Sequence, residues 1–251
     1  MSRKFAVVFE ASADFQIATD LADRVLCEAI VWLDEDTVVD QRKWLNNSPE
    51  GHLLTWTNID DSARKADVKA HGHFDGEPAE PDAIAARRAI RYLRFAFDDL
   101  DAILLIRDQD KVPERKKGLE QARSENHHGL PIVIGLAVVE REAWVLSGFA
   151  PANEDETTLL VKERENLGFQ PHEQSHLLTA CTNDQAKRSP KRVLQALTAG
   201  DPTRQQICWQ TTALTTLRER GTENGLTSYL DEVLQKLAPL LGHPDSDSGV
   251  C

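Results

Sequence analysis

Three short apolar runs divide the first 150 residues of the chain. They occupy residues 4–9, 102–107 and 132–139. Each run is apolar throughout rather than at alternate positions, which is typical of a strand buried on both faces in a parallel sheet. A fourth strand is expected at 53–57. It lies inside the segment 34–82, which is acidic, rich in turn-forming residues and expected to be mostly loop.

The segments between these runs repeat apolar residues every three or four positions, as amphipathic helices do. Helices are expected at 14–33, 82–97, 113–125, 141–147, 158–165, 190–198, 203–220 and 225–241. Strands that alternate with helices predict an α/β fold, with a mostly parallel, Rossmann-like sheet flanked by helices. The expected organisation is a domain at 1–150 with an insertion at about 34–82, a C-terminal helical lobe at 151–242, and a disordered polar tail at 243–251.

Composition narrows the class of protein. The chain carries 29 basic and 41 acidic side chains, a net charge of −12, which disfavours general coating of nucleic acid by charge alone. The apolar runs are too short to span a bilayer, and the N-terminus lacks the core of a signal peptide. We therefore expect a cytoplasmic protein without a membrane segment. The 4 cysteines are far apart and without metal-binding spacing, so free thiols are expected.

Acidic residues follow each of the three apolar runs. Glu10 and Asp14 follow the first, Asp108 and Asp110 the second, and the third leads into Glu140-Arg141-Glu142. Ligands of open parallel sheets bind at the carboxyl ends of the strands, and clustered carboxylates suit Mg²⁺ or Mn²⁺. The alternative is that these acids cap the helices that follow, because Asp and Glu are favoured at helix N-termini.

The pattern resembles the Toprim domain, the metal-binding module of topoisomerases, bacterial primases and the overcoming-lysogenization-defect nucleases. Glu10 matches the Glu after the first strand, and Asp108 and Asp110 match the later D-x-D, although Ala11 stands where the nuclease branch commonly has Gly. The segments 142–146 (Glu-Ala-Trp-Val-Leu) and 191–194 (Lys-Arg-Val-Leu) are similar to an uncharacterised Toprim-like family encoded beside ATPases in bacteria. The resemblance covers roughly 4–20, 100–150 and 187–241.

The resemblance implies phosphodiester chemistry that depends on Mg²⁺ or Mn²⁺ as cofactor. Catalytic roles fall to Glu10 and Asp14, and the implied metal ligands are Glu10, Asp108, Asp110 and Glu142. A topoisomerase is disfavoured because the only tyrosines, Tyr92 and Tyr229, lie in helical patterns. From the resemblance we expect a nuclease-like effector with an ATPase partner, in an anti-phage defence system. The chain has no phosphate-loop motif, so if ATP drives the system, a separate ATPase must supply it.

Two basic clusters are candidates for contact with a nucleic-acid substrate, DNA or RNA. The candidate residues are Arg87, Arg91, Lys187, Arg188, Lys191 and Arg192. Ordinary solvated helix faces are the alternative for each cluster. The sequence leaves open whether the protein forms a homo-oligomer.

Other readings of the sequence remain open. The segment from His172 to His176 matches H-E-x-x-H, a zinc-protease motif when it lies on a helix. The pairs His71/His73 and His127/His128 could bind metal or contact phosphate. A non-catalytic Toprim-like regulatory or interaction subunit is the alternative to the nuclease, because a fold does not dictate an activity.

Overall fold

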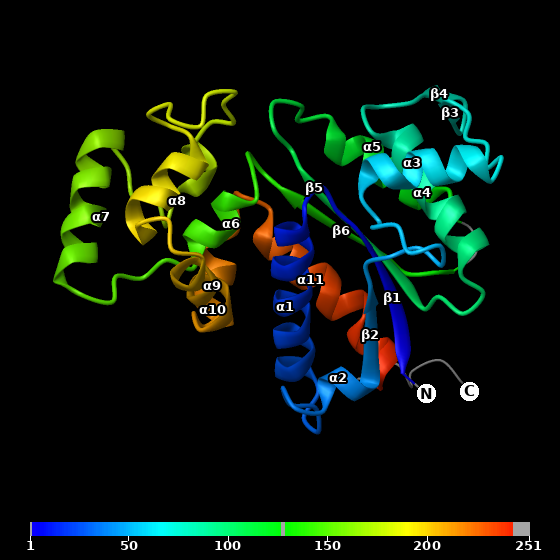
Figure 1. Cartoon of the computed structure of the whole chain (residues 1–251), viewed down its shortest axis with the longest axis horizontal. Helices are drawn as coiled ribbons and strands as arrows, with labels where there is room; N and C mark the ends of the chain where they lie inside the picture. The colour runs from blue at the N-terminus through cyan, green and yellow to red at the C-terminus, as the bar shows by residue number, and fades with distance from the viewer. Residues whose placement is uncertain (1, 127–128, 243–251) are drawn as a thin grey trace. The chain divides into compact units, whose positions relative to one another are not determined.

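The computed structural model describes residues 2–126 and 129–242 (Figure 1). The tail predicted at 243–251 lies outside the described residues. The chain divides into two compact units. The described part of the first comprises 2–107, 112–126, 129–135 and 231–242, and the second comprises 108–111 and 136–230. The domain boundary expected at residue 150 remains a prediction.

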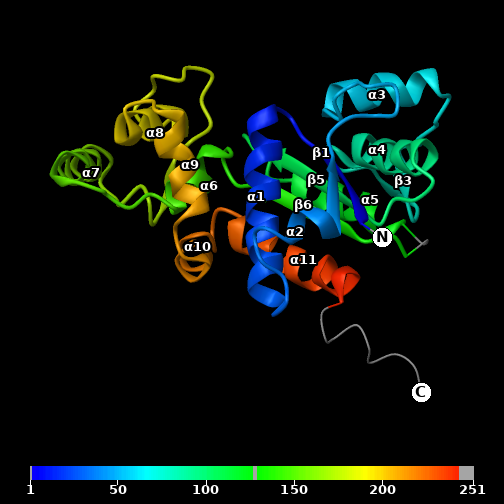
Figure 2. The same cartoon turned by 60° about the horizontal axis from the view of Figure 1, so that its bottom comes forward.

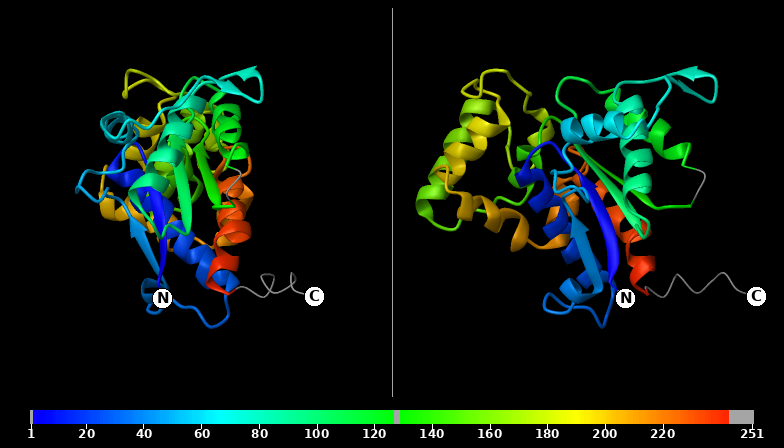
Figure 3. Two further views of the ribbon diagram at one scale, coloured as in Figure 1. Left: turned by 90° about the vertical axis from the view of Figure 1, so that its right-hand side faces the viewer. Right: turned by 45° about the vertical axis from the view of Figure 1, so that its right-hand side comes forward.

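The first unit is built on a sheet of parallel strands, as predicted. Strands β1 (Arg3–Val8), β2 (Arg42–Leu45), β5 (Ala102–Asp108) and β6 (Ile132–Ala137) lie in the order β2-β1-β5-β6 (Figure 3). Phe5 of β1 is in register with Trp44 on one side and Ala102 on the other. Residues 5–8 and 102–105 are buried, which explains their apolar character throughout. The structure is thus α/β and compatible with a Rossmann-like fold.

Helices cover both faces of this sheet. Helix α1 (Ser12–Ala29) and the second half of α11 (Leu226–Lys236) lie along one face, while α4 (Ala83–Ala96) and α5 (Arg115–Ser124) lie along the other (Figure 2). The strand order explains the places of α1, α4 and α5. The crossover through α1 leads from β1 to β2, whereas those through α4 and α5 lead in the opposite direction across the sheet, and right-handed crossovers in opposite directions place their helices on opposite faces.

The segment 34–82 contains more regular structure than its composition predicts. It holds α2 (Val38–Gln41), β2, α3 (Trp56–Lys65) and the short hairpin of β3 (His73–Phe74) and β4 (Glu77–Pro78). The strand expected at 53–57 is wrong, since only isolated bridges form at Leu53 and Thr55 before α3 begins. Strand β2 escaped prediction because it is a short, half-buried edge strand with two basic residues.

The second unit is helical. It contains α6 (Glu142–Ser147), α7 (Glu154–Leu167), the 3₁₀ turn η1 (Ser175–Leu177), α8 (Pro190–Thr198), α9 (Pro202–Gln210), α10 (Leu214–Arg220) and the first half of α11. The single helix expected at 203–220 is therefore two. At the other end, Lys236 closes α11, and a separate 3₁₀ turn, η2 (Ala238–Leu241), follows.

The predictions about membrane segments and cysteines concern the apolar runs and the thiol groups of the chain. Among the described residues, no helix combines the length and the apolar character that crossing a bilayer requires. Cys27, Cys181 and Cys208 are free thiols, as expected, and Cys251 lies outside the described residues. Burial raises the pKa of the Cys208 thiol to about 11.

Helix α5 approaches the turn before α4 at Gly118. A Cβ atom at Gly118 would lie 1.8 Å from the carbonyl oxygen of Pro81 and 2.9 Å from the amide nitrogen of Ala83. Both neighbours are backbone atoms, so they have little freedom to move aside. The glycine therefore sets how closely the two segments pack.

We expect Gly118→Ala to destabilise the protein by about 1–3 kcal/mol through overpacking. The sign of the change in unfolding free energy is informative, because Gly→Ala at a solvent-exposed position inside a helix stabilises a protein by about 0.5–1 kcal/mol. Chemical denaturation would measure it, with Lys117→Ala at the exposed neighbouring position as control. A stabilised Gly118→Ala variant would contradict the close approach.

Candidate functional site

The acidic residues predicted to form one site belong to both compact units. Glu10 and Asp14 lie in the first unit, while Asp108, Asp110 and Glu142 lie in the second.

Glu10 takes part in a chain of charged side chains at the end of β1. Its carboxylate lies 3.2 Å from Nη1 of Arg107, and Nε of Arg107 lies 3.0 Å from Oδ2 of Asp82. Asp82 also accepts from Nε of Arg115, at 2.9 Å. Arg107 is further held over the ring of Trp56, 5.1 Å from the centroid. Glu10 thus has a cationic partner, and that partner is fixed from two other sides.

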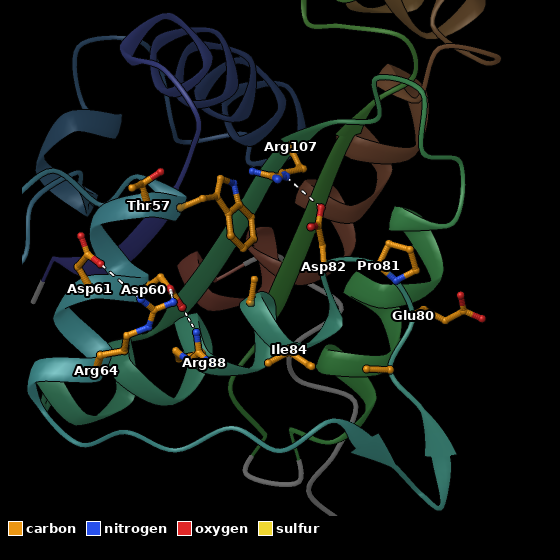
Figure 4. Close-up of a pocket in the computed structure, with 13 residues that line it drawn as sticks. Thr57, Asp60, Asp61, Arg64, Glu80, Pro81, Asp82, Ile84, Arg88 and Arg107 are labelled. Atoms are coloured by element: carbon orange, nitrogen blue, oxygen red, sulfur yellow. Dashed lines mark hydrogen bonds and ion pairs between the residues drawn. The ribbon is translucent and has the colours of Figure 1, made fainter.

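A pocket of about 850 Å³ opens beside Arg107 (Figure 4). Trp56 lines it and is anchored by its indole N–H, which donates to the carbonyl oxygen of Ile106 at 2.9 Å. The charged side chains around the pocket are Arg64, Arg88, Arg107, Asp60, Asp61, Glu80 and Asp82. Arg64 and Arg88 both pair with Asp60. The opposite charges largely neutralise one another, so the lining attracts neither anions nor cations strongly.

Asp14 occupies a helix-capping position. Its carboxylate accepts from the backbone N–H of Ala11 at 2.7 Å, while its own N–H donates to the carbonyl oxygen of Ala11 at 2.9 Å. This is the arrangement that the capping alternative describes. Asp14 is also buried, with 6% of its surface exposed. The catalytic role predicted for it remains a prediction, and its contacts give it a structural one.

Two of the predicted metal ligands in the second unit also support the start of a helix. Asp108 accepts from the backbone N–H of Arg141, the residue before α6, at 2.8 Å. Glu142 opens α6 and accepts from Nη2 of Arg141 at 2.5 Å. Carboxylates in these positions complement the positive end of the helix. The loop between β6 and α6 is thereby tied to the end of β5.

The backbone around these carboxylates is unusual. Asp110 has φ of 51° and Val139 has φ of 75°. A β-branched residue with positive φ is a genuine outlier and costs about 1–3 kcal/mol. The N–H of Asp110 donates to the carbonyl oxygen of Val139 at 2.9 Å and joins the two strained positions. Such strain is concentrated at functional sites more often than elsewhere.

Glu140, directly after Val139, is the carboxylate whose environment is most unusual for a charge. Only 6% of its surface is exposed, and its Oε2 atom is buried without a hydrogen-bond partner in the described structure. Burial, with the nearby carboxylates of Glu142, Asp110 and Asp184, raises the pKa of Glu140 to about 6, although Lys191 opposes the shift.

Lys191 is the cationic neighbour of this carboxylate group. Burial disfavours its charged form, but Glu140, Glu142 and Asp184 outweigh that effect and raise the pKa of Lys191. Its ammonium group lies 3.5 Å from the carboxylate of Asp184. We name the carboxylates of Asp110, Glu140 and Glu142, together with the ammonium group of Lys191, the carboxylate cluster. Glu140 was not among the predicted site residues. Its position directly after the third apolar run is the feature of the sequence that could have identified it as a site residue.

The predicted nucleic-acid contacts differ in how they are placed. Arg87 is only 2% exposed and pairs with Glu125, so its guanidinium belongs to the packing of α4 rather than to the surface. Arg192 donates two hydrogen bonds to Glu163, at 2.8 and 2.7 Å. Arg91, Lys187, Arg188 and Lys191 are exposed. Of the six predicted nucleic-acid contacts, these four are therefore the ones whose side chains could touch a nucleic acid at the surface.

No three His, Cys, Asp or Glu side chains within residues 2–126 and 129–242 are arranged so that they could hold a metal ion.

The H-E-x-x-H segment is not one α-helix, since His172 lies in a turn and His176 in η1. The two histidines therefore do not share a helix face, as a zinc protease would require. His127 and His128 lie outside the described residues. The donor atoms of the carboxylate cluster nevertheless suit a hard cation.

Comparison with known proteins assigns no family. No family model matches the chain, no curated protein matches it, and no solved structure matches it. The resemblance to the Toprim domain therefore rests on the sequence motifs.

The pKa of Glu140 generates a prediction about stability. A folded-state pKa of about 6 exceeds the ordinary value of 4.5, so ionisation of Glu140 destabilises the fold as the pH rises through this window. With a chelator present, we expect Glu140→Gln to gain stability relative to the wild type, by up to about 2 kcal/mol between pH 4.5 and pH 7.

Glu163→Gln provides the matched control, because Glu163 is similarly buried but paired with Arg192. We expect this variant to lose about 1.5–3 kcal/mol at pH 7, since charged hydrogen bonds are broken. Urea denaturation across the pH range would measure both variants. If Glu140→Gln is destabilised to the same extent as Glu163→Gln, the carboxylate of Glu140 is satisfied in the fold.

Proposed function

We propose that the protein is a nuclease-like phosphodiester hydrolase that depends on Mg²⁺ or Mn²⁺. The observation that carries the proposal is Glu140, a buried carboxylate without a partner for Oε2, close to Asp110 and Glu142. A buried, partly protonated carboxylate beside other carboxylates is a common feature of sites that bind a cation or transfer a proton. The strained backbone at Asp110 and Val139 also supports a functional loop.

The donor set fits a weakly caged magnesium ion. Mg²⁺ usually retains several waters and is held by one or two carboxylates together with the phosphates of its substrate. A preformed group of three protein ligands is therefore not required, and the described residues contain none. Glu140, together with one neighbouring carboxylate, Asp110 or Glu142, would hold the ion. When bound, such an ion stabilises the negative charge that develops during phosphodiester cleavage.

The residues of the cluster supply further chemistry. With a pKa of about 6, Glu140 can accept a proton from an attacking water near neutral pH. Lys191 keeps its positive charge and can offset the charge of a phosphate. Lys187 and Arg188 are exposed in the turn before α8 and can contact the backbone of DNA or RNA.

Several parts of the proposal rest on the resemblance to the Toprim-like families. They are the catalytic role of Glu10, the metal-binding role of Asp108, an ATPase partner, and participation in anti-phage defence. Glu10 already pairs with Arg107, and Asp108 accepts from the backbone of Arg141. These contacts would orient both carboxylates, and a role in catalysis can be tested for each by separate substitution.

A non-catalytic regulatory subunit is the second candidate. It is favoured by one observation, that Asp14, Asp108 and Glu142 already have partners at the starts of helices. The negative charge of carboxylates with such partners is already compensated within the protein, so their presence does not require a cation. Glu140 is the exception, and it is therefore the residue on which the two functions differ.

The test of the proposal is a titration with Mg²⁺ and Mn²⁺, read by calorimetry and by cleavage of labelled DNA and RNA. We expect cation binding and cleavage in the wild type. Glu140→Gln and Asp110→Asn should each lower the cleavage rate roughly 100-fold or more, as loss of a general base or metal ligand commonly does.

Glu165→Gln serves as the control, because it removes one carboxylate from the exposed face of α7 in the same unit. It should cleave as the wild type does. Cation binding without cleavage in every variant would favour the regulatory subunit. A wild type that binds neither cation would overturn the metal-dependent function.

A further inference from the structure

A small basic pocket lies in the first unit, at the side of α4. It has a volume of about 330 Å³ and is bordered by α4, α5 and the loop before β3. Its polar lining consists of His71, Arg87, Arg91, Arg94, Glu125 and Asn126. None of these residues takes part in the carboxylate cluster.

Three arginines reach the pocket because of their spacing on α4. Arg87, Arg91 and Arg94 are four and three residues apart, so they lie on one face of the helix. Arg87 forms the base, where it pairs with Glu125 and donates to the carbonyl oxygens of His71 and His73. The ring of Phe74 packs against its guanidinium, with 3.4 Å from Cζ to the ring centroid. The floor is thereby rigid.

Arg91 and Arg94 supply the available charge. Both side chains are exposed. Arg91 uses one N–H in a bond to the carbonyl oxygen of Lys69, at 2.7 Å. Within the part of the chain that the structure describes, Arg94 has no hydrogen bond or ion pair, so its guanidinium is available to a ligand. A guanidinium can bind phosphate oxygens through two parallel N–H groups.

The charge of the lining selects the ligand. Three guanidinium groups face one carboxylate, that of Glu125, which leaves a local charge of about +2 in a chain whose net charge is −12. One buried donor, the Nε–H group of Arg87, also lacks a partner in the described structure. Buried polar groups left in this way commonly have an unseen water or ion as their partner.

We propose that this pocket binds a phosphate monoester. Such a group carries about −1.5 to −2 charges at pH 7, which matches the lining better than the single charge of a phosphodiester. A pocket of this size encloses a terminal group, whereas the backbone of a nucleic acid runs across a surface. The shared chemistry is found in free nucleoside monophosphates and in the 5′-phosphate end of an oligonucleotide. The proposal does not depend on the phosphodiesterase function.

The experiment is calorimetric titration of the full chain in the presence of a chelator. The probes are inorganic phosphate, a nucleoside monophosphate, and one oligonucleotide with either a 5′-phosphate or a 5′-hydroxyl. We expect saturable binding of the monoester probes, and at least about tenfold weaker binding of the 5′-hydroxyl oligonucleotide. A preference for the monophosphate or for the phosphorylated oligonucleotide identifies the source of the ligand, and both outcomes support the pocket.

The variant Arg91→Gln/Arg94→Gln tests the residues, since both side chains are exposed. Besides the two charges, the variant removes the bond from Arg91 to the carbonyl oxygen of Lys69. It should weaken monoester binding by about tenfold or more. Lys116→Gln/Lys117→Gln is the matched control, because it removes two exposed positive charges from α5 in the same unit. Equal binding of the 5′-phosphate and 5′-hydroxyl oligonucleotides, equal loss in both variants, or no binding of any probe would overturn the proposal. Because no divalent cation is present, each of these results leaves the metal-dependent function untouched.

Discussion

The side chain and carbonyl group of Asn224 join three segments of the second unit. Asn224 is completely buried, and its carbonyl oxygen accepts from the N–H of Val138 at 2.8 Å and from the indole of Trp144 at 3.0 Å. Its amide nitrogen lies within hydrogen-bonding distance of Ser147 and Ser175. One residue thus fixes the end of β6, α6 and η1 at once. The loop that carries Glu140 begins at Val138, so its position depends on this network. Removing one partner from such a buried network leaves the remaining groups unsatisfied, which is costly in a dry interior.

The same region shows how structural and chemical demands are distributed among carboxylates. Asp14 and Asp108 accept from backbone N–H groups at the beginnings of helices, and Glu142 accepts from the guanidinium of Arg141 at the beginning of α6. Glu140 receives no comparable compensation and lies next to a strained valine. A fold tolerates an isolated cost of this kind when the surrounding contacts are strong, and Asn224 provides them. The contrast between satisfied and unsatisfied acids distinguishes Glu140 more clearly than its place in any motif.

The sequence predicts those parts of the fold that are fixed by apolar periodicity. Strands β1, β5 and β6 were predictable because burial on both faces demands unbroken apolar runs. Strand β2 was not, because an edge strand such as Arg-Lys-Trp-Leu needs only one buried side, here Trp44 packed on Phe5 at 5.2 Å. At the candidate site, the sequence identified acids at strand ends. It could not show that Arg87 is buried beneath Phe74 or that Glu140 lacks a partner, since both depend on contacts between distant segments.

The path of the chain through the second unit has an evolutionary consequence. The main segment of this unit enters at Leu136 and leaves at Leu230. The two ends are adjacent, because Val138 bonds to Asn224 and a Cβ atom on Gly225 would lie 2.2 Å from the carbonyl oxygen of Leu136. A segment with neighbouring ends behaves as an insertion, and insertions can lengthen, shrink or be exchanged without changing the order of the strands. A protein with this sheet can therefore carry a different helical unit at the same place without any change to its strands.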